Sequence, residues 1–375
     1  MISPNAHLRD ISAYTPGASP EQIKVQYGLD HVEKLASNEN PLGASPVAIA
    51  AAVSALSTMS LYQDGGMALR TRLAHFHHVD PSCISLNNGS DAIIHQVMRV
   101  FLHPGRTALS SEGSFVSFRI AVKGADRDFR LVPMLPGYRF DVRALAAAVD
   151  ATTQVVYIAN PNNPTGTFIT HDELVWLMDQ LSDDVLVVLD EAYIEYAQVL
   201  AASSYPAESF TRPNLLRLRT FSKAYGLAAL RIGYALGDPD VIQWLHRTKL
   251  PFDPNGIGCA AAIAALDDAD FVKSTVDLNA STSALLHRTL HELGFTTSNS
   301  VANFVMIDLH DRARAEAFHI ELLHHGFISR PLVGFGLPTC VRISTGTTAQ
   351  SERLTHVLRS CAAAFSGPLP STSEL

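Results

Sequence analysis

From about residue 80 to residue 235 the sequence alternates short runs of β-branched and other apolar residues with amphipathic stretches. The run Val185–Leu189 is apolar at every position, which is typical of a strand buried on both faces of a sheet. This alternation predicts an α/β fold in which helices flank a mostly parallel central sheet. We expect strands at Cys83–Asn87, Thr107–Ser110, Phe129–Val132, Gln154–Ala159, Val185–Leu189, Asn214–Thr220 and Ile232–Leu236.

The pattern changes after this region. An alanine-rich stretch at Cys259–Leu266 and a long segment at Asp270–Leu293 both have helical character. They are followed by the expected strands Asn303–Leu309 and Cys340–Ser344, with a helix between them around Arg314–His325 and a last helix after Thr347. This order of elements predicts a second, smaller α+β unit.

The 375 residues are enough for two or three structural units. Residues 1–42 are expected to form a loop-rich N-terminal segment that crosses onto a neighbouring element or subunit, and residues 43–255 a large α/β domain. Residues 256–365 are expected to form the small α+β domain, and residues 366–375 a disordered tail.

Charge and cysteine usage limit the partners and the compartment. With 28 Lys+Arg against 36 Asp+Glu the net charge is −8, so we expect no nucleic-acid partner and no anionic membrane surface. The four cysteines lie far apart without a Cys-x-x-Cys pair, which favours free thiols in a reducing cytosol. Since neither a signal-peptide pattern nor a long apolar run is visible, we predict a cytoplasmic protein.

A lysine follows the predicted strand Asn214–Thr220 almost directly. Lys223 is preceded by the hydroxyl residues Thr220 and Ser222, and Arg231 follows eight positions later. These residues can present an amine beside an anion-binding pocket. A lysine in a loop is usually a solvated surface charge, so the interpretation depends on the motifs around it.

Two further motifs follow predicted strands. Asn160–Gly166, with the sequence Asn-Pro-Asn-Asn-Pro-Thr-Gly, comes after the strand ending at Ala159, and Asp190–Tyr193 comes after Leu189. Ligands of open α/β folds bind at the carboxyl ends of parallel strands. Asn-Pro-Thr-Gly is also a good turn sequence, and an Asp after a strand can cap a helix. The functional interpretation therefore rests on the order and spacing of these motifs with Lys223.

Together these motifs resemble the fold-type I aminotransferases that use pyridoxal 5′-phosphate, and more narrowly the histidinol-phosphate aminotransferases. The resemblance extends from Leu35–Gly43 to Cys340–Gly346. It implies that Lys223 binds the cofactor covalently and then moves a proton between the substrate Cα and the cofactor C4′. It also implies that Asp190 pairs with the pyridine nitrogen, while Asn163 and Tyr193 form hydrogen bonds with the phenolic oxygen.

Physical chemistry supports these roles. A carboxylate beside the ring nitrogen keeps the nitrogen protonated, so that the ring can accept the charge of a carbanion. Donors at the phenolic oxygen stabilise its anionic form, and the released Lys223 amine then acts as a base near neutral pH. We therefore predict Lys223, Asp190 and Tyr193 as the catalytic residues.

The cofactor phosphate needs its own binding site. Asn88–Asp91 followed by the apolar-periodic Ala92–Phe101 predicts a loop that opens a helix, and backbone N–H groups at such a helix start bind phosphate. The resemblance assigns cofactor contacts to Gly89, Ser90, Asp91, Thr220, Ser222 and Arg231. It also matches Phe115 to an aromatic that stacks on the pyridine ring, for which ordinary core packing is the alternative.

The resemblance also implies a homodimer with two shared sites. Tyr62 matches a tyrosine that reaches the cofactor phosphate from the partner subunit. The family pattern at this point is Tyr-Pro-Asp, whereas this chain has Gln63 in place of the proline, so its loop is less rigid.

Substrate contacts are predicted near the C-terminus and in the N-terminal segment. Arg330 and Arg342 lie at positions where the family forms a fork for a carboxylate or a phosphate. An isolated arginine in a strand often has only a surface role. Tyr14 resembles a third contact to a substrate phosphate, and Asn40 is expected to line the same pocket.

The predicted reaction is a ping-pong transamination in histidine biosynthesis. Glutamate donates the amine and leaves as 2-oxoglutarate, and imidazole acetol phosphate accepts it to become histidinol phosphate. Departures from the family pattern at Gln63 and Ala229 are also compatible with an aromatic amino acid aminotransferase. The motifs are compatible, too, with a threonine-phosphate decarboxylase-like enzyme and with a non-catalytic regulatory protein that binds the cofactor.

Two patterns are set aside. Gly256–Ala261 fits a dinucleotide-binding glycine motif, but it follows an irregular stretch instead of a strand, so we expect a loop that leads into a helix. The histidines of His75–His78 and the pair His324 and His325 lack the spacing of a zinc site. We expect these histidines to be solvated or to cap helix ends, and we predict no metal site.

Overall fold

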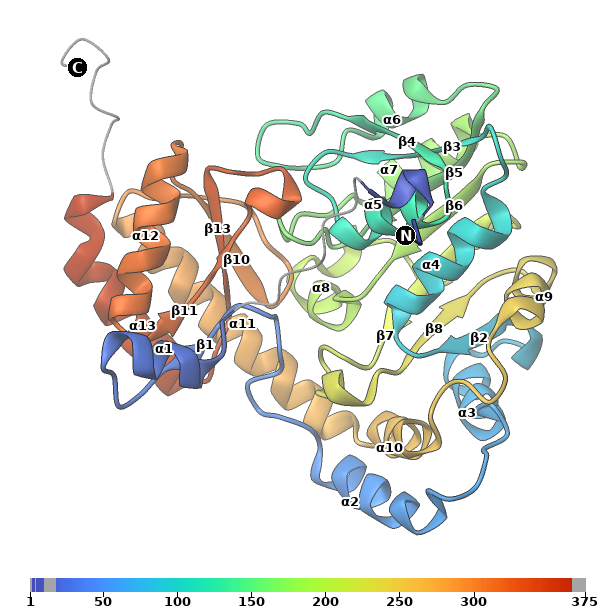
Figure 1. The fold of residues 1–375 in the computed structure, drawn as a ribbon, viewed down its shortest axis with the longest axis horizontal. Helices are drawn as coiled ribbons and strands as arrows, with labels where there is room; N and C mark the ends of the chain where they lie inside the picture. Colours follow the sequence, from blue (N-terminus) through green and yellow to red (C-terminus); the bar gives the residue numbers. More distant parts are fainter. Residues whose placement is uncertain (1, 4, 10–17, 366–375) are drawn as a thin grey trace.

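The computed structural model describes residues 2–3, 5–9 and 18–365 (Figure 1). Within these residues the strands form a seven-stranded sheet, a four-stranded sheet and a two-stranded sheet. Tyr14 and the predicted tail 366–375 lie outside the described residues.

The seven-stranded sheet has the order β2-β8-β7-β6-β5-β3-β4. The strands from β7 to β4 run parallel to one another, while β8 is antiparallel to both of its neighbours. The prediction of a mostly parallel sheet is therefore confirmed, and so are its seven strands. Their bounds are β2 (Ile84–Asn87), β3 (Thr107–Ser111), β4 (Asp128–Val132), β5 (Thr153–Ala159), β6 (Leu186–Asp190), β7 (Leu215–Thr220) and β8 (Gly233–Leu236).

Helices cover both faces of this sheet (Figure 1). Along β6, Leu186 and Val188 pack on one face, whereas Val187 and Leu189 pack on the other, because successive side chains of a strand alternate. The first face is covered by α4 (Ser90–Phe101), α5 (Val116–Gly124) and α9 (Pro239–Thr248). The second face is covered by α6 (Val142–Ala148) and α7 (His171–Gln180).

A third layer of helices packs at the β2–β8 edge. It consists of α2 (Pro46–Ala55), α3 (Met67–His77) and α10 (Gly256–Asp267). The Asn255 side chain accepts a hydrogen bond from the Gly258 N–H and caps α10, so the prediction of a loop that leads into a helix is confirmed. α10 shares a hydrophobic cluster with β2 and β8, so this helix packs on the large unit. The division between residues 255 and 256 stays a prediction.

The smaller unit is built on an antiparallel sheet with the order β12-β13-β10-β9. Its strands are β9 (Thr296–Thr297), β10 (Phe304–Asp308), β12 (Arg330–Pro331) and β13 (Cys340–Ser344). Its core is formed with α11 (Ala269–Glu292), α12 (Arg312–His324) and α13 (Thr348–Cys361). The long helix α11 runs between the two units and also contacts α8 (Ile194–Leu200), which follows β6 (Figure 1).

The N-terminal segment crosses onto the smaller unit, as the sequence predicts. Its strand β1 (Glu33–Lys34) pairs in parallel with β11 (Phe327–Ile328). The prediction that the segment is loop-rich is wrong at α1 (Pro20–Tyr27), a helix that begins with a capping box between Ser19 and Gln22. Ile23 of α1 is buried against Leu323 and Ile328, which fixes the segment to the smaller unit.

Short 3-10 helices complete the described structure at Ala6–Leu8, Leu56–Thr58, Pro81–Cys83, Ala202–Ser204, Ala228–Leu230, Val333–Phe335 and Ala362–Ala364. Among the described helices, none combines the length and the apolar character needed to cross a lipid bilayer.

Candidate active site

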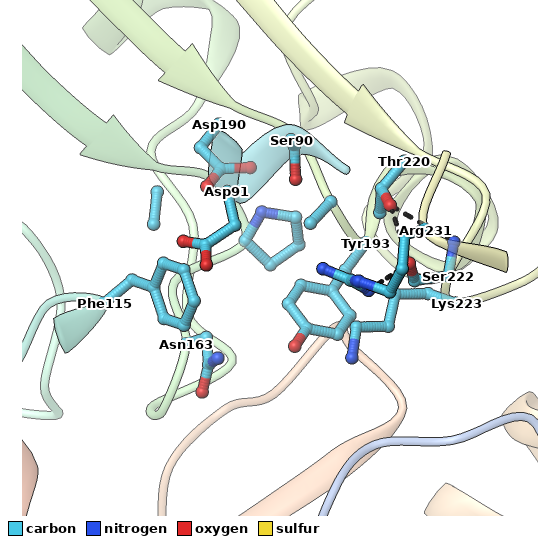
Figure 2. Close-up of a pocket in the computed structure, with 13 residues that line it drawn as sticks. Ser90, Asp91, Phe115, Asn163, Asp190, Tyr193, Thr220, Ser222, Lys223 and Arg231 are labelled. Atoms are coloured by element: carbon cyan, nitrogen blue, oxygen red, sulfur yellow. Dashed lines mark hydrogen bonds between the residues drawn. The ribbon is translucent and has the colours of Figure 1, made fainter. Parts of the chain in front are cut away.

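A pocket lies at the carboxyl ends of the parallel strands β5, β6 and β7, where the last residues are Ala159, Asp190 and Thr220. Figure 2 shows predicted site residues from distant parts of the chain around this one space. Ten of them line the pocket: Ser90, Asp91, Phe115, Asn163, Asp190, Tyr193, Thr220, Ser222, Lys223 and Arg231. The structure therefore brings together motifs that are up to 141 positions apart (231 − 90) in the sequence.

Lys223 is held at the wall of the pocket by the loop after β7. Its Nζ donates a hydrogen bond of 3.3 Å to the Ser37 carbonyl and lies 5.6 Å from the centre of the Tyr193 ring. Burial lowers the pKa of the Lys223 amine to about 8, and the nearby Arg342 contributes to this lowering. The lowered pKa raises the uncharged fraction of this amine near neutral pH, and the uncharged form is the one that acts as a nucleophile or a base.

Asp190 presents one free oxygen to the pocket. Its side chain is buried, and Oδ2 accepts a hydrogen bond of 2.7 Å from the Tyr157 hydroxyl. Oδ1 is also buried but has no hydrogen-bond partner. Burial raises the pKa of the Asp190 carboxyl to about 6, an effect that the Tyr157 hydroxyl opposes. A buried oxygen without a donor is costly, so this atom favours a cationic or N–H partner.

Tyr193 is positioned by a residue that the sequence interpretation missed. The Asn38 Nδ2 donates a hydrogen bond of 2.9 Å to the Tyr193 hydroxyl. Asn38 is itself fixed by Ser344, which accepts from its backbone N–H and donates to its Oδ1, both at 2.9 Å. The only sequence signal is its place beside Asn40 in the motif Ser37–Pro41, because both partners lie far away in the chain.

The start of α4 forms a compact loop beside Arg231. Gly89 has a φ of +89°, and a Cβ at this position would lie 2.8 Å from Nη2 of Arg231. Across the pocket wall, the Thr220 hydroxyl donates to Ser222, and Nη1 of Arg231 donates to Ser222 at 3.4 Å. Free N–H groups at a helix start, two hydroxyls and a guanidinium are the partners that a phosphate group requires.

Phe115 and Asp91 lie together on one side of the pocket in Figure 2, across from Lys223. Phe115 lines the pocket and also packs against the core beneath the sheet, while its stacking on the cofactor ring stays a prediction. Oδ1 of Asp91 is buried without a hydrogen-bond partner, and the Asp91 charge raises the pKa of the Asp190 carboxyl.

Arg342 reaches the pocket from β13. Its Nη1 donates to Oδ1 of Asn163, and its Nη2 donates to the Ala36 carbonyl at 2.8 Å. Arg330 lies opposite Arg342 in the β12–β13 pairing. Because the side-chain oxygen of Asn163 accepts from Arg342, its amide nitrogen remains available to donate into the pocket.

Of the predicted site residues that the structure describes, five lie outside the pocket lining: Gly89, Arg330, Arg342, Asn40 and Tyr62. Nδ2 of Asn40 donates to the Ala224 carbonyl at 2.9 Å and to Thr275 at 3.0 Å, so this amide supports the loop that carries Lys223. Tyr62 is 84% exposed and stacks on Phe252 with the ring centres 4.3 Å apart. Their predicted roles, like that of Tyr14 outside the described residues, stay predictions.

The histidine groups differ in environment. The side chain of His77 is 3% exposed and forms a 2.9 Å hydrogen bond with Tyr234, so the expectation of a solvated or capping histidine is wrong here. His78 ends α3 in a left-handed conformation, as a capping residue does. In the part of the chain that the structure describes, His, Cys, Asp and Glu side chains form no group of three that could hold a metal ion.

The pocket as a whole fits pyridoxal 5′-phosphate. The unpartnered Oδ1 of Asp190 suits a protonated ring nitrogen, and the loop before α4 with Ser222 and Arg231 suits the phosphate. Lys223, which lies beside Ser222 and Arg231 in Figure 2, supplies an amine of lowered pKa. Each end of the cofactor thus meets a partner of complementary charge.

Comparisons with known proteins agree with this fit. The family model for aminotransferase class I and II matches residues 30–358. The chain is 42% identical over 355 residues to histidinol-phosphate aminotransferase 2 of Pseudomonas aeruginosa, with 94% of this chain and 95% of that protein covered. It is 41% identical to histidinol-phosphate aminotransferase 1 of Thiobacillus denitrificans, with 98% of this chain and 96% of that protein covered.

Solved structures with the same fold include two kinds of aminotransferase. The histidinol-phosphate aminotransferase of Sinorhizobium meliloti, in complex with pyridoxal-5′-phosphate, matches with a TM-score of 0.86 and 31% identity over 96% of this chain and 97% of that one. An aspartate aminotransferase of Thermus thermophilus with maleate matches with a TM-score of 0.82 at 22% identity, over 96% of this chain and 100% of that one. The second similarity concerns the fold alone.

Proposed function

The chain belongs to the aminotransferase class I and II family, and from this premise we propose that it is a histidinol-phosphate aminotransferase of histidine biosynthesis. It uses pyridoxal 5′-phosphate to transfer the amino group of glutamate to imidazole acetol phosphate, which gives 2-oxoglutarate and histidinol phosphate. Relatives of that name cover nearly the whole chain at about 40% identity, which supports this substrate over an aromatic amino acid or a decarboxylation substrate.

The observation that carries the proposal is the pairing of Lys223 and Asp190 in one pocket. An amine with a pKa of about 8 and a buried acid with one unpartnered oxygen both line this space. Structural roles alone give no reason for the buried Asp190 carboxyl and the partly buried Lys223 amine to lie there, because both would gain from solvation.

When bound, pyridoxal 5′-phosphate supplies a protonated ring that takes up the electron pair released at the substrate Cα. Asp190 Oδ1 would hold the proton at the ring nitrogen. Lys223 Nζ would move a proton between the substrate Cα and the cofactor C4′. Tyr193 and the amide of Asn163 would donate hydrogen bonds to the phenolic oxygen, while Arg231, Ser222 and the start of α4 would bind the phosphate.

Substrate recognition is assigned to Arg342 and Arg330. Both arginines lie on neighbouring strands of the smaller unit, and Arg342 already contacts Asn163 at the pocket. A pair of guanidinium groups can bind the carboxylate of glutamate in one half-reaction and an anionic group of the second substrate in the other.

The proposed assembly is a homodimer in which Tyr62 reaches the phosphate of the neighbouring site. Large apolar side chains are exposed in the segment that precedes Tyr62 in the sequence, among them Val53 at 60%, Met59 at 72% and Leu61 at 65%. A contiguous exposed apolar surface is one mark of a protein–protein interface. The stacking of Tyr62 on Phe252 gives the loop a defined shape without the proline of the family pattern.

A cytoplasmic location is proposed as well. The cysteines Cys83, Cys259, Cys340 and Cys361 are all free, and burial raises the pKa of the Cys259 and Cys340 thiols. Such thiols are compatible with a reducing compartment.

Borohydride reduction of the holoprotein followed by peptide mapping tests the central assignment. The reduced pyridoxyl group is expected on Lys223. If Lys223 carries no label in protein that has bound the cofactor, the enzyme assignment is wrong.

A substrate comparison tests the narrower assignment. Purified protein with glutamate and imidazole acetol phosphate is expected to produce 2-oxoglutarate and histidinol phosphate. Much faster use of phenylpyruvate, or release of carbon dioxide from a phosphorylated amino acid, would replace histidinol phosphate as the substrate while leaving the cofactor assignment intact.

A further inference from the structure

Tyr157 contacts the acid of the active site from the sheet side. It lies in β5, and its side chain is wholly buried beneath the pocket. Its hydroxyl donates a hydrogen bond of 2.7 Å to Oδ2 of Asp190. Neither the sequence motifs nor the pocket lining includes this residue.

The pairing of β5 with β6 brings the two residues together. Ala159 lies opposite Asp190, and Tyr157 lies opposite Val188. Because residues two apart on a strand share a face, Tyr157 and Asp190 lie on the same side of the sheet as diagonal neighbours. The Tyr157 ring is stacked on Phe118 of α5, with centroids 5.0 Å apart and an angle of 12° between the planes. The hydroxyl is therefore held in a fixed position.

The two oxygens of Asp190 have different surroundings. Oδ2 is occupied by the Tyr157 hydroxyl, whereas Oδ1 has no hydrogen-bond partner. A hydrogen bond on one oxygen fixes the rotation of the carboxylate and leaves the other oxygen for a second donor. We propose that Tyr157 is a positioning residue that directs Oδ1 of Asp190 to the cofactor ring nitrogen and favours the ionised carboxylate there. This inference rests on the proposed function.

Electrostatics around Asp190 explain why such a donor is needed. Burial raises the pKa of its carboxyl to about 6, and the charges of Asp91 on α4 and Glu191 act in the same direction. Among the groups that lower this pKa, the Tyr157 hydroxyl has the largest effect. Burial and the Asp190 charge raise the pKa of Tyr157 itself well above its usual value, so its hydroxyl keeps its proton and remains a donor.

The test compares two ligands on the apoprotein. Tyr157→Phe removes the hydroxyl and keeps the ring on Phe118. Loss of a hydrogen bond to a charged group corresponds to a change of about tenfold in an equilibrium constant, so we expect the Kd of pyridoxal 5′-phosphate to rise about tenfold. The Kd of a carbocyclic analogue with a C–H in place of the ring nitrogen should not change. A merely structural role would weaken both ligands equally.

Tyr205→Phe is the matched control. Tyr205 is also buried, and its hydroxyl donates to the Asn160 carbonyl instead of Asp190. This control should leave the ratio of the two Kd values at its wild-type level. If Tyr205→Phe weakened pyridoxal 5′-phosphate but not the carbocyclic analogue, the proposal would be overturned, because the effect would then not require contact with Asp190.

The same substitution in an Asp190→Asn protein distinguishes an effect through Asp190 from a general effect on folding. If Tyr157 acts through Asp190, adding Tyr157→Phe to Asp190→Asn should not change the ratio of the two Kd values any further. An equal loss of both ligands in Tyr157→Phe, or no loss of either, overturns the role of Tyr157. The proposed function has a separate criterion, namely labelling of Lys223 and transamination by the wild-type protein.

Discussion

At the scale of single residues, the buried Asp190 carboxylate lowers the stability of the apoprotein, although the proposed function requires it. The pKa of this carboxyl is about 6 in the folded protein against 3.8 for the ordinary group, a difference of about 2 units. Because the pKa of Asp190 is raised in the folded state, its protonated carboxyl contributes stability that is fully present below about pH 4. This contribution is lost as the pH rises through about 6 and the buried carboxyl ionises. At pH 7.5 the buried charge therefore destabilises the apoprotein by up to about 3 kcal/mol.

We predict that Asp190→Asn abolishes transamination and stabilises the apoprotein at pH 7.5 but not at pH 4. Urea unfolding at the two pH values measures the difference in the free energy of unfolding. Asp184→Asn, an exposed carboxylate just before β6, is the control and should change little at either pH. Equal stabilisation by Asp190→Asn at both pH values would show that the charge is not the cause.

The single side chain of Arg342 is expected to bind substrate in both half-reactions. Arg342→Ala removes the contacts to Asn163 and to the Ala36 carbonyl as well as the proposed substrate contact. We expect kcat/KM for glutamate and for imidazole acetol phosphate each to fall about a hundredfold or more. Half-reactions followed by the absorption of the bound cofactor provide the measurement, and an unchanged value for either substrate would show that the anion site is elsewhere.

At the scale of elements, the loop before α4 joins backbone shape to phosphate binding. Gly89→Ala would place a Cβ 2.8 Å from Arg231 in a backbone of φ +89°, so both the loop and the guanidinium must move. We predict a loss of stability of about 1–2 kcal/mol from the strained backbone. We also predict that the Kd of pyridoxal 5′-phosphate rises at least about tenfold, whereas the affinity for pyridoxal, which lacks the phosphate, changes little.

Gly105→Ala separates the two effects. Gly105 also has a positive φ, of +75°, but an added Cβ would have no atom within 4 Å. It should lose stability without losing selectivity for the phosphorylated cofactor. If Gly89→Ala weakens pyridoxal and pyridoxal 5′-phosphate equally, the loop does not bind the phosphate.

The elements also show what a sequence can reveal. Strand β6 is predictable because five consecutive apolar residues are easily recognised, and its acid follows directly at Asp190. Helix α1 escapes prediction because Ile23 is its only buried residue, although Ser19 and Gln22 form a capping box. Asn38 and Tyr157 escape it because each acts through a residue that only the folded chain brings near, Tyr193 and Asp190 respectively.

At the scale of the whole molecule, the proposed dimer predicts complementation between defective subunits. Lys223→Ala and Tyr62→Ala proteins, mixed under conditions that exchange subunits, should form hybrids in which one site has both native residues. At limiting cofactor the mixture is expected to exceed the summed activity of the separate proteins. The same mixture without subunit exchange is the control, and absence of any gain would contradict a site shared through Tyr62.

The pocket wall is closed by two segments from opposite ends of the chain. Arg342 donates to the Ala36 carbonyl and Ser344 to Asn38, and each pair is separated by 306 positions. On the ribosome, the segment around Ala36 is made long before β13 emerges, so the nascent polypeptide lacks one wall of the site during most of its translation. Loading with vitamin B6 in the finished geometry therefore requires that β13 has been made and has folded against the segment around Ala36.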